Sequence, residues 1–220
     1  MPNNPWLAEW YKRQSTSLST PNAPTNIGAI ADALDAGMMF KPDIASMLNS
    51  ILAMRYAFTP DNPIDKVHIL GSLGDIVSDP IRQLYGQTPG FQKIAPTKVI
   101  LTNRYPDAKL GFDQPHSFPA ERMNLMGVFW HPGVNNPALR STYAPEKANI
   151  ALYPYYNKTL GNIGQTFAHE TRHALDYAFN KKLPPRYFDL DVPYAQRQME
   201  RAAEQFPLAI LKNIARRSLR

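Results

Sequence analysis

The stretch from residue 162 to residue 180 carries the clearest helical pattern in the chain, and the remaining elements have to be arranged around it. Its apolar residues recur at the spacing of one helix face, which is typical of a helix packed against a core. They are Ile163, Phe167, Ala174, Ala178 and Phe179. The run Lys-Lys-Leu-Pro-Pro at 181–185 ends the pattern, because proline cannot continue a helix. The sequence therefore predicts an amphipathic helix over 162–180.

Three residues in the middle of this helix, His169, Glu170 and His173, form the pattern H-E-x-x-H. Residues four apart lie on one helix face, about 6 Å from each other, so both imidazoles can bind one ion. Zn²⁺ accepts such nitrogens at ~2.0–2.1 Å. Glu170 lies about 100° around the helix, where its carboxylate can touch a water molecule on the metal. The pattern predicts a zinc site, and the alternative is two histidines and an ordinary glutamate that share a helix.

A catalytic zinc site usually has three protein ligands and one open position, so a third ligand is needed. Asp176 shares the helix face, but it lies about 10 Å beyond His169 along the axis and cannot bind the same ion. We expect Asp176 to support the site or to be a charge on the helix surface. His131 follows a predicted strand, and we expect it to be structural, although its place beside a loop would let it reach a pocket.

Two downstream carboxylates are the other candidates, because Glu200 and Glu204 lie one turn apart on a predicted C-terminal helix. The small residues Ala202 and Ala203 beside them allow two helices to approach closely. We therefore expect Glu200 to reach the ion from the side opposite the histidines.

An exposed salt-bridge face is the alternative for this segment, since Arg197 and Arg201 lie on either side of Glu200. In that case a ligand would have to come from the loops around His116 or His131. The residues alone leave both readings open.

The pattern H-E-T-R-H, followed by E-x-x-x-E in a second helix, resembles the gluzincin branch of the zincin metallopeptidases over residues 167–206. In that family the downstream glutamate is the third zinc ligand, and an acid four residues later supports a zinc-bound histidine. The resemblance implies that Glu200 is the ligand and Glu204 the supporting acid. The chain departs from the family at Met199, where an asparagine is usual, and at Glu204, where thermolysin-type enzymes have aspartate.

The predicted mechanism is hydrolysis of a peptide bond, with Glu170 as general base for a metal-activated water. A second donor would polarise the scissile carbonyl, and the spacing does not select it. The candidates are Tyr153, Tyr155, Tyr156, Tyr187, Tyr194 and His131. The resemblance also implies an edge strand before the helix that binds an extended protein or peptide substrate, and residues 150–153 occupy that position in the chain.

One domain over residues 26–220 is predicted to follow an N-terminal arm at 1–25, which is rich in Ser, Thr, Pro and Asn. Within the domain, 26–90 is expected to be helical, 91–155 to form the sheet and loops, and 160–216 to carry the active-site helices. This order predicts an α+β fold. The resemblance implies that the fold is zincin-like, with a small mixed sheet of about three to five strands.

Helices are expected at 27–40 and 42–58, and a last helical region from near Tyr194 to about Arg216 with a break at Pro207. Strands are expected at 66–70, 97–102, 124–130 and 150–153. The segment between the second and third strands, with Pro106, Pro115 and Pro119, is expected to be a loop.

The composition excludes several kinds of site. The chain of 220 residues has no cysteine, so disulfides, zinc ribbons and thiol nucleophiles are ruled out. The net charge of +6 is expected to reflect solvated helix faces, because no aromatic RNA-binding motif or helix-turn-helix spacing points to nucleic acid. With no signal peptide or membrane span in the sequence, we expect a cytoplasmic protein, or one exported without a classical signal peptide.

Other functions fit the same residues. A delivered bacterial toxin or a phage-associated hydrolase, including one that cuts peptidoglycan peptides, would use identical chemistry. A DNA-associated protease would be expected to add a third downstream histidine and a cysteine ribbon, which this chain lacks. A non-catalytic metal-binding protein is the last alternative, and the sequence predicts neither a particular substrate nor an oligomeric state.

Overall fold

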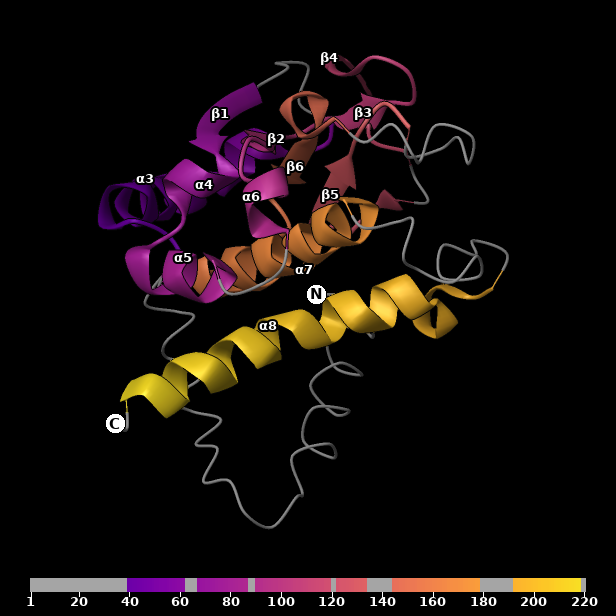
Figure 1. The fold of residues 1–220 in the computed structure, drawn as a ribbon. Coiled ribbons are helices and arrows are strands. Elements are labelled where there is room, and N and C mark those ends of the chain that lie inside the picture. The colour runs from indigo at the N-terminus through magenta and orange to yellow at the C-terminus, as the bar shows by residue number, and fades with distance from the viewer. Residues whose placement is uncertain are drawn as a thin grey trace.

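The computed structural model describes residues 39–61, 67–86, 90–119, 122–133, 144–178 and 192–218. It is a mixed α+β fold with one four-stranded sheet and one two-stranded sheet. Figure 1 shows α7 between the larger sheet and α8, so that the helix predicted from the H-E-x-x-H segment occupies the middle layer. The predicted arm at 1–25 and most of the predicted helix at 27–40 lie outside the described residues.

The larger sheet has the strand order β1-β2-β6-β5. Its strands are β1 (Val67–Ser72), β2 (Lys98–Thr102), β5 (Gly127–Trp130) and β6 (Asn149–Leu152). β2 pairs with β6 in parallel, whereas β1 pairs with β2 and β5 pairs with β6 in antiparallel fashion. The four strands confirm the predicted strand segments, although β1 lies within the stretch 26–90 that was expected to be helical.

The expectation that residues 150–153 form the edge strand is wrong. β6 lies between β2 and β5, and Ile150, Ala151 and Leu152 are fully buried. A strand that is apolar at successive positions is buried on both faces, which suits the centre of a sheet and not its edge. Among the described residues, β5 is the edge strand on the side of α7.

The helix α7 (Leu160–Ala178) confirms the predicted amphipathic helix. Ile163 and Phe167 are fully buried, and Phe167 packs against Phe40 with 5.1 Å between ring centroids. α7 packs on β5 and β6 on one side and on α8 on the other. Burial on several sides fixes the direction in which each residue of this helix points.

Shorter helices surround this core. They are α3 (Pro42–Ala53), η1 (Arg55–Phe58), α4 (Leu73–Ile76), α5 (Asp79–Gly86), α6 (Phe91–Ile94), η4 (Pro145–Lys147) and η7 (Tyr194–Gln196). None of the helices within the described ranges is long and apolar enough to cross a membrane.

A hairpin of β3 (Tyr105–Asp107) and β4 (Gly111–His116) replaces part of the loop expected around Pro106 and Pro115. Proline is tolerated in such strands because a two-stranded ribbon leaves many N–H positions without a ladder partner. Gly111 has a φ of 62°, and a Cβ there would lie 2.6 Å from the Trp130 ring. The hairpin therefore packs its backbone directly on the end of β5.

The helix α8 (Gln198–Ser218) continues through Pro207, so the predicted break there is wrong. Proline inside a helix costs about 3 kcal/mol or more, because one hydrogen bond is lost. Packing offsets this cost: Ala203 and Ile210 are buried, and Phe206 stacks on Tyr85 with 6.0 Å between centroids. Tertiary contacts thus hold α8 as one helix against its local sequence preference.

Candidate metal centre

Two histidines on successive turns of α7 turn the same ring nitrogen towards one point. His169 Nε2 and His173 Nε2 are 3.1 Å apart, and the two rings meet edge to face with centroids 4.8 Å apart. The spacing of four residues on one helix face produces this convergence. His173 is buried, whereas the side chain of His169 keeps 14% of its surface exposed, so the point is accessible from one side.

Glu200 approaches the histidines from α8. Its Oε2 atom lies 3.3 Å from His169 Nε2 and 3.4 Å from His173 Nε2. The neighbouring Ala203 is fully buried, and α7 and α8 pack closely along this contact. The structure therefore brings together the three residues that the sequence analysis selected as ligands.

The three atoms fit the ligand set of a tetrahedral metal site. Bonds of ~2.0–2.1 Å to zinc at tetrahedral angles separate neighbouring ligand atoms by about 3.3–3.4 Å. The observed separations are 3.1, 3.3 and 3.4 Å. Among the described residues, His169, His173 and Glu200 form a group that could hold a metal ion, and two nitrogens with one carboxylate oxygen suit several divalent transition metals.

Charge also favours a cation at this point. Burial alone would raise the pKa of Glu200, but hydrogen bonds and charge from His169 and His173 outweigh it and hold the pKa well below its usual range. Glu200 is therefore a carboxylate at neutral pH, with Oε2 buried beside two imidazole nitrogens.

No protein-family model, curated protein or solved structure matches the chain. The chemistry open to the site therefore depends on its own residues.

Glu170 belongs to α7, and its side chain lies against β5. It is 7% exposed, and burial raises its pKa from 4.5 to about 7, with the negative charge of Glu200 acting in the same direction. The charge of His169 and a hydrogen bond from the backbone N–H of Phe129 lower the pKa and offset part of this effect. A carboxyl group whose pKa lies near neutral pH can both accept and return a proton there.

The outer edge of β5 lies beside Glu170. Met126 and Tyr153 lie opposite each other at the start of the β5–β6 ladder and form a hydrogen-bonded pair, in which Tyr153 N donates to Met126 O at 3.0 Å. The next pair, Gly127–Leu152, is therefore one whose members do not bond to each other. Because bonded and non-bonded pairs alternate, Gly127 and Phe129 point their N–H and C=O groups away from β6. One of these groups, the Phe129 N–H, is the donor to Glu170.

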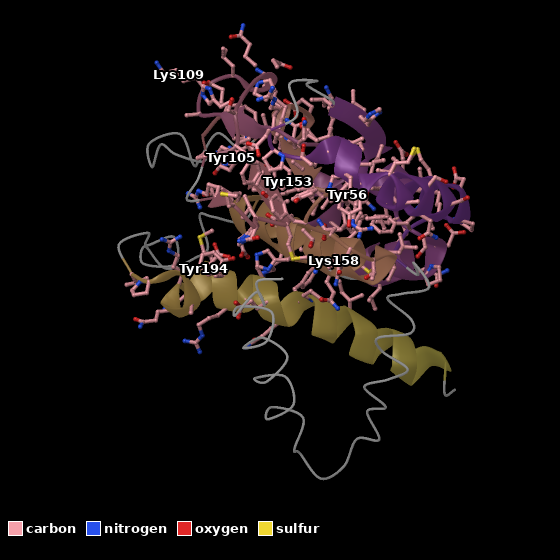
Figure 2. All side chains as sticks on the ribbon, turned by 180° about the vertical axis from the view of Figure 1, so that it is seen from behind. Tyr56, Tyr105, Lys109, Tyr153, Lys158 and Tyr194 are labelled. Carbon is pink, nitrogen blue, oxygen red and sulfur yellow. The ribbon has the colours of Figure 1, made fainter. Side chains whose placement is uncertain are left out.

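Among the candidate donors within the described residues, Tyr194 makes a hydrogen bond to a candidate metal ligand. Figure 2 labels Tyr194 just before the start of α8. Its hydroxyl donates a hydrogen bond to Glu200, and burial of this hydroxyl followed by the charge of Glu200 raises its pKa well above the usual value. The residue as a whole remains 38% exposed.

The other aromatic candidates have packing roles. Tyr153 is buried in a second core cluster on the hairpin side of the sheet, beside Phe118 at 5.1 Å between centroids. Tyr155 packs on Tyr56 and Tyr156. Tyr187 lies outside the described residues.

His131 makes packing and hydrogen-bond contacts away from the candidate ligands. Its Nδ1 accepts a hydrogen bond from Gly133 N at 3.0 Å, and its ring packs on Tyr177 at 4.5 Å between centroids. Asp176 pairs with Arg172 at 2.8 Å. Glu204 lies one turn beyond Glu200, and its support of a zinc-bound histidine stays a prediction.

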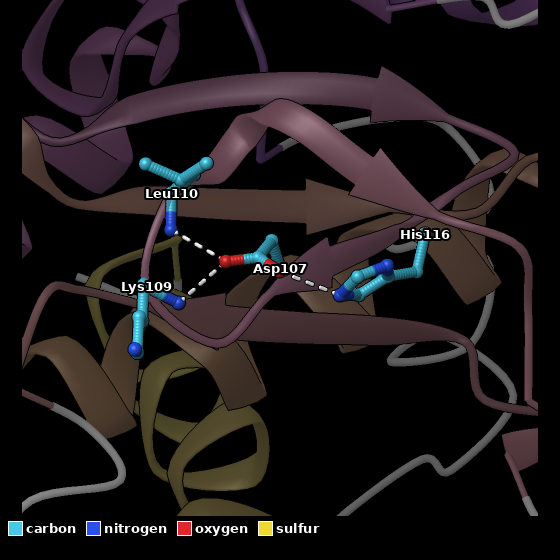
Figure 3. A network of polar contacts seen from close by, with 4 residues as sticks. All are labelled: Asp107, Lys109, Leu110 and His116. Carbon is cyan, nitrogen blue, oxygen red and sulfur yellow. Dashed lines mark hydrogen bonds and ion pairs between the residues drawn. The ribbon is translucent and has the colours of Figure 1, made fainter.

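His116 is engaged elsewhere. Figure 3 shows its Nε2 facing Asp107 Oδ2, 2.6 Å away, while Asp107 Oδ1 accepts hydrogen bonds from the backbone of Lys109 and Leu110. These contacts close the β3–β4 hairpin. Within the described ranges, neither His116 nor His131 joins the group of three ligands.

Sequence reasoning missed the backbone contribution of Phe129 and could not choose Tyr194 from the tyrosines. A backbone N–H has no signature in the sequence, and the place of Tyr194 depends on how α8 docks. The sequence places Tyr194 six residues before Glu200, but this spacing does not distinguish it from the other candidate tyrosines.

Proposed function

We propose that the protein is a zinc-dependent metallopeptidase that resembles the gluzincins in using His169, His173 and Glu200 as ligands and Glu170 as general base. The observation that carries this proposal is the triangle of ligand atoms with sides of 3.1, 3.3 and 3.4 Å, next to a buried glutamate. Bound Zn²⁺ supplies Lewis-acid polarisation and brings the pKa of water down to about 7.

Glu170 takes the proton of the attacking water and passes it to the leaving amine. Its raised pKa of about 7 suits both transfers, since the driving force for proton transfer is then balanced near neutral pH. The Phe129 N–H and the wall of β5 keep the carboxyl in one orientation.

Tyr194 is the second donor in this proposal. Its hydroxyl, now bonded to Glu200, turns to the oxygen of the scissile carbonyl as negative charge develops there.

A peptide is the substrate class that the edge of β5 favours. An extended peptide can add to a strand edge through main-chain hydrogen bonds, and the outward N–H and C=O groups of Gly127 lie on such an edge beside Glu170. Main-chain pairing depends little on the side chains of the peptide, so specificity would come from pockets for those side chains.

Metal analysis combined with a peptidase assay tests the proposal. We expect about one zinc per purified chain, near-complete loss of zinc in His169→Ala, and retained zinc in Glu170→Gln. Hydrolysis of a quenched-fluorescence peptide library should fall by about 10²- to 10⁴-fold in Glu170→Gln, because a positioned general base contributes that much.

Two results would contradict the proposal. A native protein that holds no metal and ignores added zinc would remove the metal site. A protein that binds zinc through these residues, but shows the same turnover in Glu170→Gln or none in either form, would point to another chemistry or to the non-catalytic metal-binding alternative.

A further inference from the structure

A single buried amide joins three elements around the candidate site. Asn157 is fully buried, and its Nδ2 donates to Met126 O at 2.8 Å and to Tyr153 O at 2.9 Å. Its Oδ1 accepts a hydrogen bond from Thr166 Oγ1 at 2.9 Å. Both donors of the amide and one acceptor position are therefore used by protein groups.

The three hydrogen-bond partners of Asn157 lie at the ends of β5 and β6 and on α7. Met126 immediately precedes β5, Tyr153 immediately follows β6, and Thr166 lies on α7 one turn before Glu170. The amide thus connects the two strands that border the site to the helix that carries the base. A satisfied buried network of this kind fixes a unique arrangement, because any shift would leave a buried polar group without its partner.

Gly127 shows how little space separates β5 from α7. A Cβ at this position would lie 2.5 Å from Thr166 Cγ2 and 3.1 Å from Glu170 Cγ. The strand backbone therefore rests directly on the side chains of Thr166 and Glu170. Two residues further on, the Phe129 N–H donates to the Glu170 carboxyl.

We propose that Asn157 and Thr166 are positioning residues that fix the β5 edge against Glu170, so that a peptide bound to the edge presents its scissile bond at a set distance from the base. The inference rests on the proposed peptidase function. Neither residue touches the metal ligands in the contacts described, so their effect is exerted through the placement of β5.

The position of β5 should affect the rate of catalysis as well as the stability of the fold. A displacement of about 1 Å between base and substrate can lower a rate about 10²-fold, even when the group responsible lies away from the chemistry. Loss of the Thr166–Asn157 bond would free β5 to shift by such an amount. Substrate pairing along the strand would survive, because it depends on the backbone of β5 itself.

Two variants of Thr166 separate the hydrogen bond from the packing. Thr166→Val removes the hydroxyl and keeps a methyl group against Gly127, whereas Thr166→Ser keeps the hydroxyl and removes that methyl. We expect Thr166→Val to lower kcat by about 10- to 100-fold with little change in KM and with full zinc content. Thr166→Ser is expected to keep kcat close to that of the parent.

Hydrogen exchange gives a readout that needs no turnover. In zinc-loaded protein, backbone amides at 126–130 should exchange faster in Thr166→Val than in the parent or in Thr166→Ser, while amides at 98–102 in β2 are unchanged. Asn157→Ser, which leaves room for a water molecule between the same carbonyls, serves as a second test and should show the same pattern.

The outcomes separate failure of the positioning role from failure of the proposed peptidase function. If the parent binds zinc and cuts peptides but Thr166→Val and Asn157→Ser keep kcat and exchange unchanged, the positioning role is wrong. A fall in thermal stability without a change in kcat also overturns it. If the parent cuts no peptide, the proposed function fails, and exchange at 126–130 still decides whether the bridge fixes β5.

Discussion

Glu170 illustrates, at the scale of one residue, how a site can be arranged at the expense of stability. The carboxyl is almost completely buried, and burial raises its pKa from 4.5 to about 7. A folded protein that holds such a group loses stability when the group ionises. Residues placed for chemistry commonly carry a cost of this kind.

Glu170→Gln is therefore expected to stabilise the metal-free protein at pH 8. The folded state binds the Glu170 proton more tightly than the unfolded state, so stability conferred by the protonated form is lost as pH rises from about 4.5 through about 7. The glutamine variant does not titrate, and its free energy of unfolding at pH 8 should exceed that of the parent by up to about 3 kcal/mol. Urea unfolding at pH 8 and pH 5 measures this difference.

The gain should fall to less than about 1 kcal/mol at pH 5, where the carboxyl is protonated in the folded parent and only the unfolded chain is partly ionised. Glu146→Gln, at an exposed position, is the control and should show no comparable dependence on pH. An equal gain at both pH values would mean that ionisation of Glu170 is not its cause.

Glu200→Ala should weaken zinc binding more than Glu204→Ala or Asp176→Ala. Glu200 contributes an oxygen of the ligand triangle, whereas Asp176 pairs with Arg172. We expect a loss above about 100-fold for Glu200→Ala and at most 10- to 100-fold for the other two, which is the range for partners outside the ligand set. Competition with a chelating dye gives the dissociation constants, and the reverse order would move the third-ligand assignment.

Tyr194→Phe should leave the metal and the fold intact and slow hydrolysis. The hydroxyl donates a hydrogen bond to Glu200, and loss of one donor to a developing oxyanion costs about 10²- to 10³-fold in kcat. Steady-state kinetics on the best library peptide measure it. Tyr155→Phe, in the aromatic packing cluster, is the matched control. Equal rates in both variants would remove Tyr194 from the mechanism.

At the scale of the element, β5 and α7 work as a pair. The sequence showed α7 because a helix is encoded locally, in the recurrence of Ile163, Phe167 and Ala174 on one face. The place of β5 at the edge was not readable, because strand order depends on pairings between distant segments. For the same reason β3 and β4 were mistaken for loop, since their prolines argue locally against a strand.

Gly127→Ala should disturb the contact between these two elements. The added methyl would meet Thr166, the carbonyl oxygen of Ala151 and Glu170 within 2.5 to 3.1 Å. Relief requires β5 to move, at a typical cost of about 1–3 kcal/mol for overpacking, and the movement should also lower kcat. Thermal unfolding and kinetics would show both effects.

Gly86→Ala is the control for this substitution, because nothing lies within 4 Å of a Cβ built at that position. It should be neutral or stabilise slightly, as is usual for glycine replaced at an unstrained site. If Gly127→Ala behaved in the same way, the close approach of β5 to α7 would not matter for stability.

At the scale of the whole molecule, the candidate ligands connect two layers of the fold. His169 and His173 belong to the middle layer, and Glu200 belongs to the outer helix α8 (Figure 1). The local pattern H-E-x-x-H made the first two readable from sequence. Glu200 was reached through its spacing and small neighbours, whereas the continuity of α8 through Pro207 depends on contacts that only the folded chain contains.

Zinc is expected to stabilise the folded protein, because the ligand group exists only when α7 and α8 are docked. At a free concentration of about 100 times the dissociation constant, the gain is about 2.7 kcal/mol. Thermal unfolding with zinc and with EDTA measures the shift, and His169→Ala should respond to neither. A parent protein whose melting temperature ignores both reagents would contradict this expectation.

The docking of α8 on α7 places metal ligands from two separate helices at one point, so a bound ion would link the helices. An ion bound by His173 and Glu200 would act as a cross-link that closes the intervening segment into a loop and restricts the unfolded chain. In a protein without cysteine, this is the role that a disulfide fills elsewhere. Whether such a cross-link forms depends on the supply of metal and not on redox potential. A chelator would therefore release the C-terminal helix, whereas a reductant would have no target.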